Sequence, residues 1–144
     1  MLRLTVHTKG LEAIKDKLAQ RCTKAEHTVA LQIREDTRPY VPARNFALDT
    51  TTRVDGNLII YQQPYAHYLY QGVVWVYPVT KAAGFLTEDG WKSRKGFKKI
   101  EYNRNLKISQ SNHPEAQYHW FESSKSKNLE KWVRVADKAV KNDL

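Results

Sequence analysis

The chain has 144 residues, a formal net charge of +9 and one cysteine, Cys22. This length fits a single domain with a core large enough to need no disulfide or metal, and one cysteine excludes an intrachain disulfide and a cysteine-rich zinc site. No apolar run has the form of a secretory signal or approaches the length of a membrane span, so we expect a soluble intracellular product.

The N-terminal part of the chain predicts a short strand followed by one long helix. Residues 2–6 alternate between apolar and polar side chains, the period of a half-buried strand. From Leu11 onward, apolar or small residues recur every three or four positions, at Leu11, Ile14, Leu18, Cys22, Ala25, Val29 and Ile33. Pro39 disfavours helical geometry at Arg38, so we expect the helix to end near Thr37 after about 27 residues, and residues 40–45 to form an extended connector.

The next segment predicts a β-hairpin. Residues 50–54 are rich in threonine, and residues 58–61 are β-branched or aromatic. Between them, Asp55-Gly56-Asn57 is a strong turn signal.

Residues 64–72, with the sequence PYAHYLYQG, predict two helical turns between strands. Pro64 suits a first turn and Gly72 suits a C-terminal stop. Tyr65 and Tyr68 then share a face at helical spacing, and we expect them in the core, whereas Tyr70 points elsewhere. Residues 73–77 predict a further strand, which Pro78 ends.

A second interpretation of this aromatic segment is a protein interface, because Tyr and Trp are favoured at such surfaces. In that interpretation Tyr70 and Trp75 are the candidate contacts between copies of the chain.

Residues 78–107 are expected to form an extended basic loop, arm or hairpin, with a short strand near Leu106–Ile108. Residues 81–107 hold eight basic side chains and three acidic ones. Three uses remain open: contact with the phosphates of DNA inside a ring, contact with an acidic partner through an arm anchored by Trp91 and Phe97, or a plain solvated loop. The candidate contact residues are Lys92, Arg94, Lys95, Lys98 and Lys99.

The C-terminal part predicts a closing helical region. Its apolar positions are Trp120, Phe121, Leu129, Trp132, Val133, Ala136 and Val140. We expect Trp120, Phe121 and Trp132 in the core, against the first helix and the sheet. The predicted fold is α+β, with residues 1–144 forming one domain in which two helical regions pack on a small, mainly antiparallel sheet.

The side chains that could bind a metal or take part in catalysis do not predict an enzyme. His119 and Glu122 could meet on a helix near His113, but zinc takes three or four protein ligands and no HExxH or paired-cysteine motif supplies the others. No GxSxG motif and no phosphate-binding glycine loop is present. We therefore expect no catalysis, no cofactor and no bound metal.

Four segments together resemble the small minor capsid, or neck, proteins of long-tailed bacteriophages, the head-tail connector and tail-completion family. They are DTRPYVP at 36–42, GNLIIY at 56–61, PYAHYLYQG at 64–72 and NHPEAQYHWFESSK at 112–125. The family usually has Gly-Asn-Leu or Gly-Arg-Leu before its first hairpin strand, where this chain has Asn45-Phe46-Ala47-Leu48.

The resemblance implies a virion protein that is made in the host cytoplasm and forms a ring in the neck, joining the head connector to the tail and leaving a channel for DNA. The implied partners are copies of itself, the head-closure or connector and tail-terminator proteins, and the genomic DNA, with no membrane. Two other classes remain open: a free nucleic-acid-binding protein, such as a small nuclease-like toxin, and a monomeric adaptor.

Overall fold

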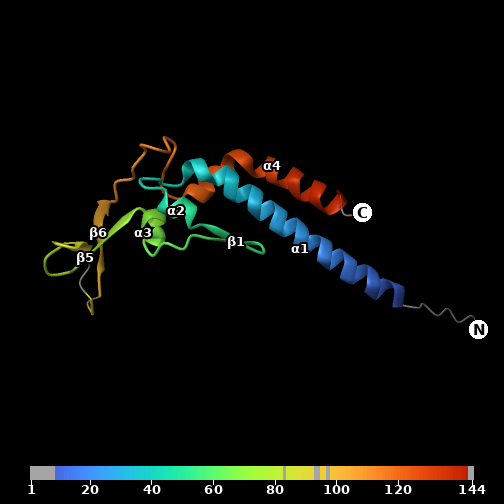
Figure 1. Ribbon diagram of the computed structural model, residues 1–144, viewed down its shortest axis with the longest axis horizontal. Coiled ribbons are helices and arrows are strands. Elements are labelled where there is room, and N and C mark those ends of the chain that lie inside the picture. Colours follow the sequence, from blue (N-terminus) through green and yellow to red (C-terminus); the bar gives the residue numbers. More distant parts are fainter. Residues whose placement is uncertain (1–8, 83, 93–94, 97, 143–144) are drawn as a thin grey trace, which may run out of the picture.

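The computed structural model describes residues 9–82, 84–92, 95–96 and 98–142, so the strand predicted at residues 2–6 lies outside the described part of the chain. Two long helices, α1 (Lys9–Thr37) and α4 (Trp120–Asn142), lie side by side. Of the small two-stranded antiparallel sheets in the described residues, the first in the chain lies beside α1, and the others lie at the end of the molecule away from the start of α1 (Figure 1). The predicted α+β fold is confirmed.

The end of α1 is where the sequence predicts it, at Thr37. The chain does not extend at once, because Pro39 occupies the first turn of a 3-10 helix, η1 (Arg38–Tyr40). Proline is well suited to such a first turn, since its missing N–H group has no helical partner there. The extended connector therefore begins at Val41, one residue later than expected.

The helices α1 and α4 run antiparallel, with the end of α1 against the start of α4. Thr37 and Ser124 are both buried, and the Thr37 hydroxyl donates a 3.0 Å hydrogen bond to Ser124 Oγ. About two turns further along α4, Trp132 is buried against α1. The two helices thus form the framework on which the smaller elements rest.

The predicted hairpin is confirmed as β1 (Arg53–Asp55) and β2 (Leu58–Ile60), joined by a turn with Gly56 at φ 58°. The threonines expected to begin the first strand lie instead in or just after a short helix, α2 (Ala47–Thr50). The hydroxyls of Thr50, Thr51 and Thr52 donate to carbonyl oxygens four residues earlier, which favours a helical turn over a strand.

A second antiparallel pair joins β3 (Val73–Val76), a predicted strand, to β6 (Ile100–Asn105). The prediction of a strand near residues 106–108 was wrong. The strand β6 ends at Asn105, and the Leu106 N–H donates to the Gly72 carbonyl oxygen. Residues 78–107 are consequently not one loop. They hold β6 and a third hairpin, β4 (Phe85–Thr87) with β5 (Gly90–Lys92).

The core lies where the connector after η1 meets α2, the start of α4 and α3 (Ala66–Gln71). Its buried residues are Tyr40, Val41, Leu48, Ala66 and Trp120, with Tyr61, Leu69 and Tyr70 packed against them.

Candidate assembly surface

The helix α3 presents a different face to the core from the one predicted. Ala66 is buried, and Leu69 and Tyr70 pack on the core, whereas the side chains of Tyr65 and Tyr68 are exposed, at 37% and 43%. Positions i, i+3 and i+4 share a helix face, so the inner face is the one that carries Ala66. The small side chain of Ala66 lets α3 approach the core closely. The expectation that Tyr65 and Tyr68 lie in the core was therefore wrong.

Tyr70 links α3 to the first turn of α4. Its ring lies edge-on to Trp120, with ring centres 4.8 Å apart, and edge-on to His119, at 5.1 Å. Its hydroxyl donates a hydrogen bond to Glu122 Oε2. Burial, together with this hydrogen bond and the nearby carboxylate, raises the pKa of Tyr70, and the same hydrogen bond lowers the pKa of Glu122. These contacts within the chain give Tyr70 a structural role.

A group of exposed or half-buried rings lies on α3 and the neighbouring strand β3. We call Tyr65, His67, Tyr68 and Trp75 the aromatic patch. The His67 and Tyr68 rings are 5.7 Å apart, and the Tyr68 and Trp75 rings are 6.3 Å apart, both edge-on. Trp75 lies in β3 between buried Val74 and Val76, so its side chain points to the opposite face of the strand.

The helix α4 places the three predicted core aromatics differently. Trp120 and Trp132 are buried. Phe121 is exposed at 37%, and its ring stacks on Trp132 with centres 6.0 Å apart, so it covers the core from outside and its assignment to the core was wrong. Adjacent helical positions point about 100° apart, so Phe121 lies at the edge of the face whose centre Trp120 occupies.

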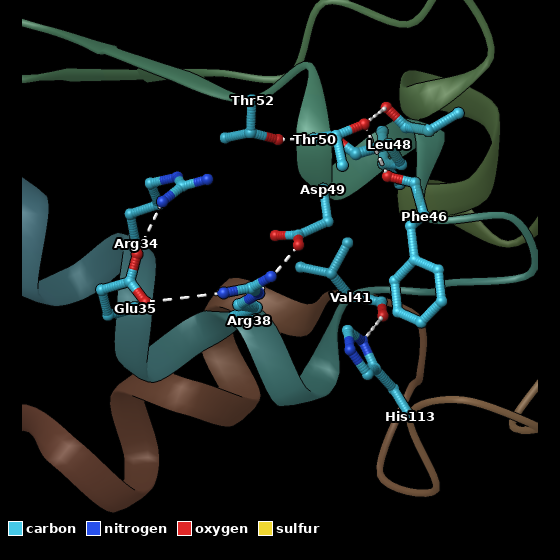
Figure 2. A network of polar contacts seen from close by, with 11 residues as sticks. Arg34, Glu35, Arg38, Val41, Phe46, Leu48, Asp49, Thr50, Thr52 and His113 are labelled. Atoms are coloured by element: carbon cyan, nitrogen blue, oxygen red, sulfur yellow. Dashed lines mark hydrogen bonds and ion pairs between the residues drawn. The ribbon is translucent and has the colours of Figure 1, made fainter.

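The segment before α4 holds the connector in place. His113 Nδ1 lies 2.7 Å from the Val41 carbonyl oxygen, and the Asn112 amide donates to the carbonyl oxygens of Ala43 and Arg44. Figure 2 shows His113 beneath the connector, with its ring edge-on to Phe46. Asn112 and His113 therefore have structural partners.

An ion-pair network fixes α2 to the end of α1 (Figure 2). Arg38 Nε lies 2.8 Å from the buried Asp49 Oδ2, and Glu35 pairs with Arg34 at 2.6 Å. We did not predict this network. Arg38 and Asp49 are eleven positions apart on different elements, so no helical periodicity relates them.

An open groove of about 1000 Å³ lies between α1, α4 and the β1–β2 hairpin. Ala25, Val29 and Ile33 form its floor on α1, Leu58 and Ile60 line one wall, and Val140 lines the other. Among the described residues that line it, Glu26 alone is an Asp, Glu, Lys or Arg. We did not predict the groove, although the apolar spacing along α1 was its sequence signal.

The candidate basic residues that the structure describes lie at the end of β5 and in the segment between β5 and β6. Lys92 ends β5 and pairs with Asp89 at 3.1 Å, while Lys98 and Lys99 precede β6. Lys92, Lys95 and Lys98 are exposed. Arg94 and Phe97 lie outside the described residues, as does the side chain of Trp91.

The described residues hold neither a metal-binding cluster nor a membrane-spanning helix. They contain no group of three or more His, Cys, Asp or Glu side chains placed to hold a metal ion. In the same part of the chain, no helix has the length and apolar character needed to cross a membrane.

Comparison with known proteins relates the chain to a family of phage proteins. The family described as minor capsid protein matches residues 2–140. No curated protein and no solved structure matches the chain. Since the match spans nearly the whole sequence, the chain belongs to the minor capsid protein family and is a structural protein of the phage virion.

Proposed function

We propose that this minor capsid protein is a ring-forming subunit of the phage neck, which joins the head connector to the tail and leaves a channel for the genomic DNA. The observation that carries the proposal is the presence of two unlike apolar surfaces on one elongated subunit. The aromatic patch lies on α3 and β3, and the other surface is the N-terminal part of α1, where Ile14 and Leu18 are 61% and 52% exposed.

These two surfaces lie well apart along the molecule, since α3 and β3 lie towards the end that carries β6 and the start of α1 marks the other end (Figure 1). Surfaces that differ in shape and composition favour a head-to-tail contact over a symmetric pair. When the rotation between successive subunits closes, a head-to-tail contact generates a ring. The aromatic patch supplies Tyr and Trp, which are favoured as interface anchors.

We assign the basic residues of the β4–β5 hairpin and the following segment to contact with an acidic neighbour in the neck. A hairpin that carries exposed Lys92, and Lys95 and Lys98 just beyond it, suits an arm that reaches towards a partner. The alternative is that these residues face the lumen and attract DNA through its phosphates. A conduit should avoid tight binding, and aromatic residues beside lysines in the sequence would tend to hold single strands by stacking, which favours the arm.

Interrupting the gene for this chain in the phage tests the proposal. We expect filled heads and complete tails that are not joined, and recovery of joined virions when the wild-type chain is supplied in trans. Joined virions formed without the chain would contradict the assignment.

We also propose that the chain is not an enzyme. A purified chain that cleaves DNA with magnesium, and loses that activity in His119→Ala, would support the nuclease alternative instead.

A further inference from the structure

The first part of α1 carries an apolar stripe, Ile14 and Leu18, whose side chains are more than half exposed. We call Lys9–Arg21 the α1 extension. Its first turns run past the C-terminal end of α4, and α1 has 29 residues against 23 in α4 (Figure 1). Ile14 and Leu18 are one turn apart, and the next turn brings Cys22, which lines the groove. The exposed stripe therefore continues the groove floor along the same helix.

The extension and the groove match in length. Thirteen residues of helix, from Lys9 to Arg21, span roughly 20 Å. The stretch of α1 that contributes to the groove, from Cys22 to Thr37, spans roughly 24 Å. An amphipathic helix that places apolar side chains at positions i and i+4 is a common occupant of such a groove.

The charges of the two surfaces are complementary. At about 100° per residue, Lys15 and Arg21 flank the Ile14–Leu18 stripe on its two sides, and Asp16 lies on the far side of the helix. A helix docked through this stripe brings basic side chains to the groove, where Glu26 is the charged residue of the described lining. Two extensions packed on each other would instead bring their basic flanks together, which is repulsive.

We propose that the groove of one subunit binds the α1 extension of a second copy, head to tail. This inference rests on the proposed ring, and it names the contact that builds the ring. The aromatic patch adjoins the groove, because His67 lines the groove and its ring lies beside that of Tyr68. The groove and the patch then form one continuous acceptor surface for the neighbouring subunit.

Photo-crosslinking in assembled virions tests the contact directly. Leu18 is replaced with p-benzoylphenylalanine in the phage-encoded chain, and Asp16, on the far side of the same turn, is replaced in the control. We expect irradiation of the Leu18 virions to give adducts that map to the groove lining of a second copy. Because each subunit has one donor and one acceptor, we also expect covalent oligomers larger than a dimer. Adducts that stop at the dimer would indicate a reciprocal pair and contradict the head-to-tail contact.

Substitutions on each side provide an independent test. Ile14→Ser with Leu18→Ser removes the stripe, and Leu58→Ser removes an exposed apolar side chain of the groove (59% exposed). We expect each variant to keep the wild-type melting temperature and to reduce the yield of joined virions at least about 10-fold, because losing one apolar anchor costs 1.4 kcal/mol or more. The matched control is Val79→Ser, an exposed apolar residue outside the groove, which should have no effect.

Charge reversal adds a rescue. Glu26→Lys should lower the yield, and combining it with Lys15→Glu and Arg21→Glu should restore it. Failure of the triple variant to recover, with the chain still folded, contradicts the proposed contact. The proposed ring and the proposed contact can be contradicted separately. Absence of the chain from the neck would contradict the ring. A ring whose Leu18 adducts lie outside the groove would contradict only the contact.

Discussion

The indole Nε1 of Trp132 donates a 2.9 Å hydrogen bond to Asp36 Oδ2, and this bond joins the two long helices at their buried contact. Lys131 Nζ and Gln32 Nε2 donate to the other carboxylate oxygen, at 2.7 Å and 3.0 Å. The contact between α1 and α4 is therefore stabilised both by the hydrogen bonds to Asp36 and by the apolar packing of Trp132.

Trp132→Ala should lower the free energy of unfolding by about 3 to 5 kcal/mol, because it leaves a large cavity and removes a donor from Asp36. Leu129→Ala, one turn away on the exposed side of α4, is the control and should cost much less. Urea denaturation of the two variants measures the difference. Equal losses would mean that Trp132 contributes no more than a surface residue.

The stability of the protein should fall in acid partly through Asp36. Burial acts to raise the pKa of Asp36, but hydrogen bonds from Lys131, Trp132 and Gln32 outweigh it and hold the pKa below its usual 3.8. A depressed pKa adds stability above the unfolded value, and that contribution is lost as the pH falls through the folded value. In denaturation series from about pH 5 to about pH 2, the advantage of the wild type over Asp36→Asn should shrink. A constant difference would contradict this linkage.

Gly72 should tolerate alanine less well than Gly56. Both have positive φ, at +73° and +58°, so alanine costs about 1 to 2 kcal/mol in backbone strain at either site. At Gly72 an added Cβ would also lie 2.5 Å from the Tyr118 ring, whose hydroxyl donates to the Leu106 carbonyl oxygen. At Gly56 no other described atom lies within 4 Å. Thermal denaturation of both variants separates backbone strain from the collision with Tyr118. A similar fall in melting temperature for the two variants would exclude the collision.

The sequence predicted where helices and strands lie better than which side of each one is buried. Helical spacing divides the segment around α3 into two aromatic faces but does not decide which one is buried. The face with Ala66 is buried because its small side chain allows a close approach to the core. Trp120 and Glu122, which are fifty or more positions later in the chain, contact Tyr70 on the same face. Such long-range partners cannot be seen in a local pattern.

The strand β6 was missed for a related reason. Residues 100–105 mix Glu, Asn and Arg with Ile100 and Tyr102, and all are exposed, so no periodic apolar signal marks them. They form a strand because Val74 and Val76 of β3 pair with them. The end of α1 and the β1–β2 hairpin, in contrast, depend on local features, Pro39 and Gly56, and both were predicted correctly.

The aromatic patch should matter for assembly, and Tyr70 for the stability of the subunit. Tyr68→Ala and Trp75→Ala should each weaken subunit association by about 2 kcal/mol or more if they anchor the interface. Tyr70→Phe loses only the hydrogen bond to Glu122, so its free energy of unfolding should fall by about 1 kcal/mol. Yields of joined virions and melting curves measure the two effects. Normal assembly of both patch variants would remove the patch from the interface.

Replacing Lys92, Arg94, Lys95, Lys98 and Lys99 with Ser, while keeping Trp91 and Phe97, should distinguish the uses of the basic segment. We expect loss of assembly, because the arm would lose its attraction to an acidic neighbour. Assembly and genome delivery are scored separately in the same phage. Normal assembly with failed delivery would place the segment in the lumen, and normal behaviour in both would leave it a solvated segment.

The central claim is that this chain forms a ring in the virion neck, and native mass spectrometry of neck complexes released from virions tests it most directly. We predict that the complex contains a single fixed number of copies, three or more, and that the number is the same in every preparation. A complex that contains one copy of the chain, or none, would contradict the account.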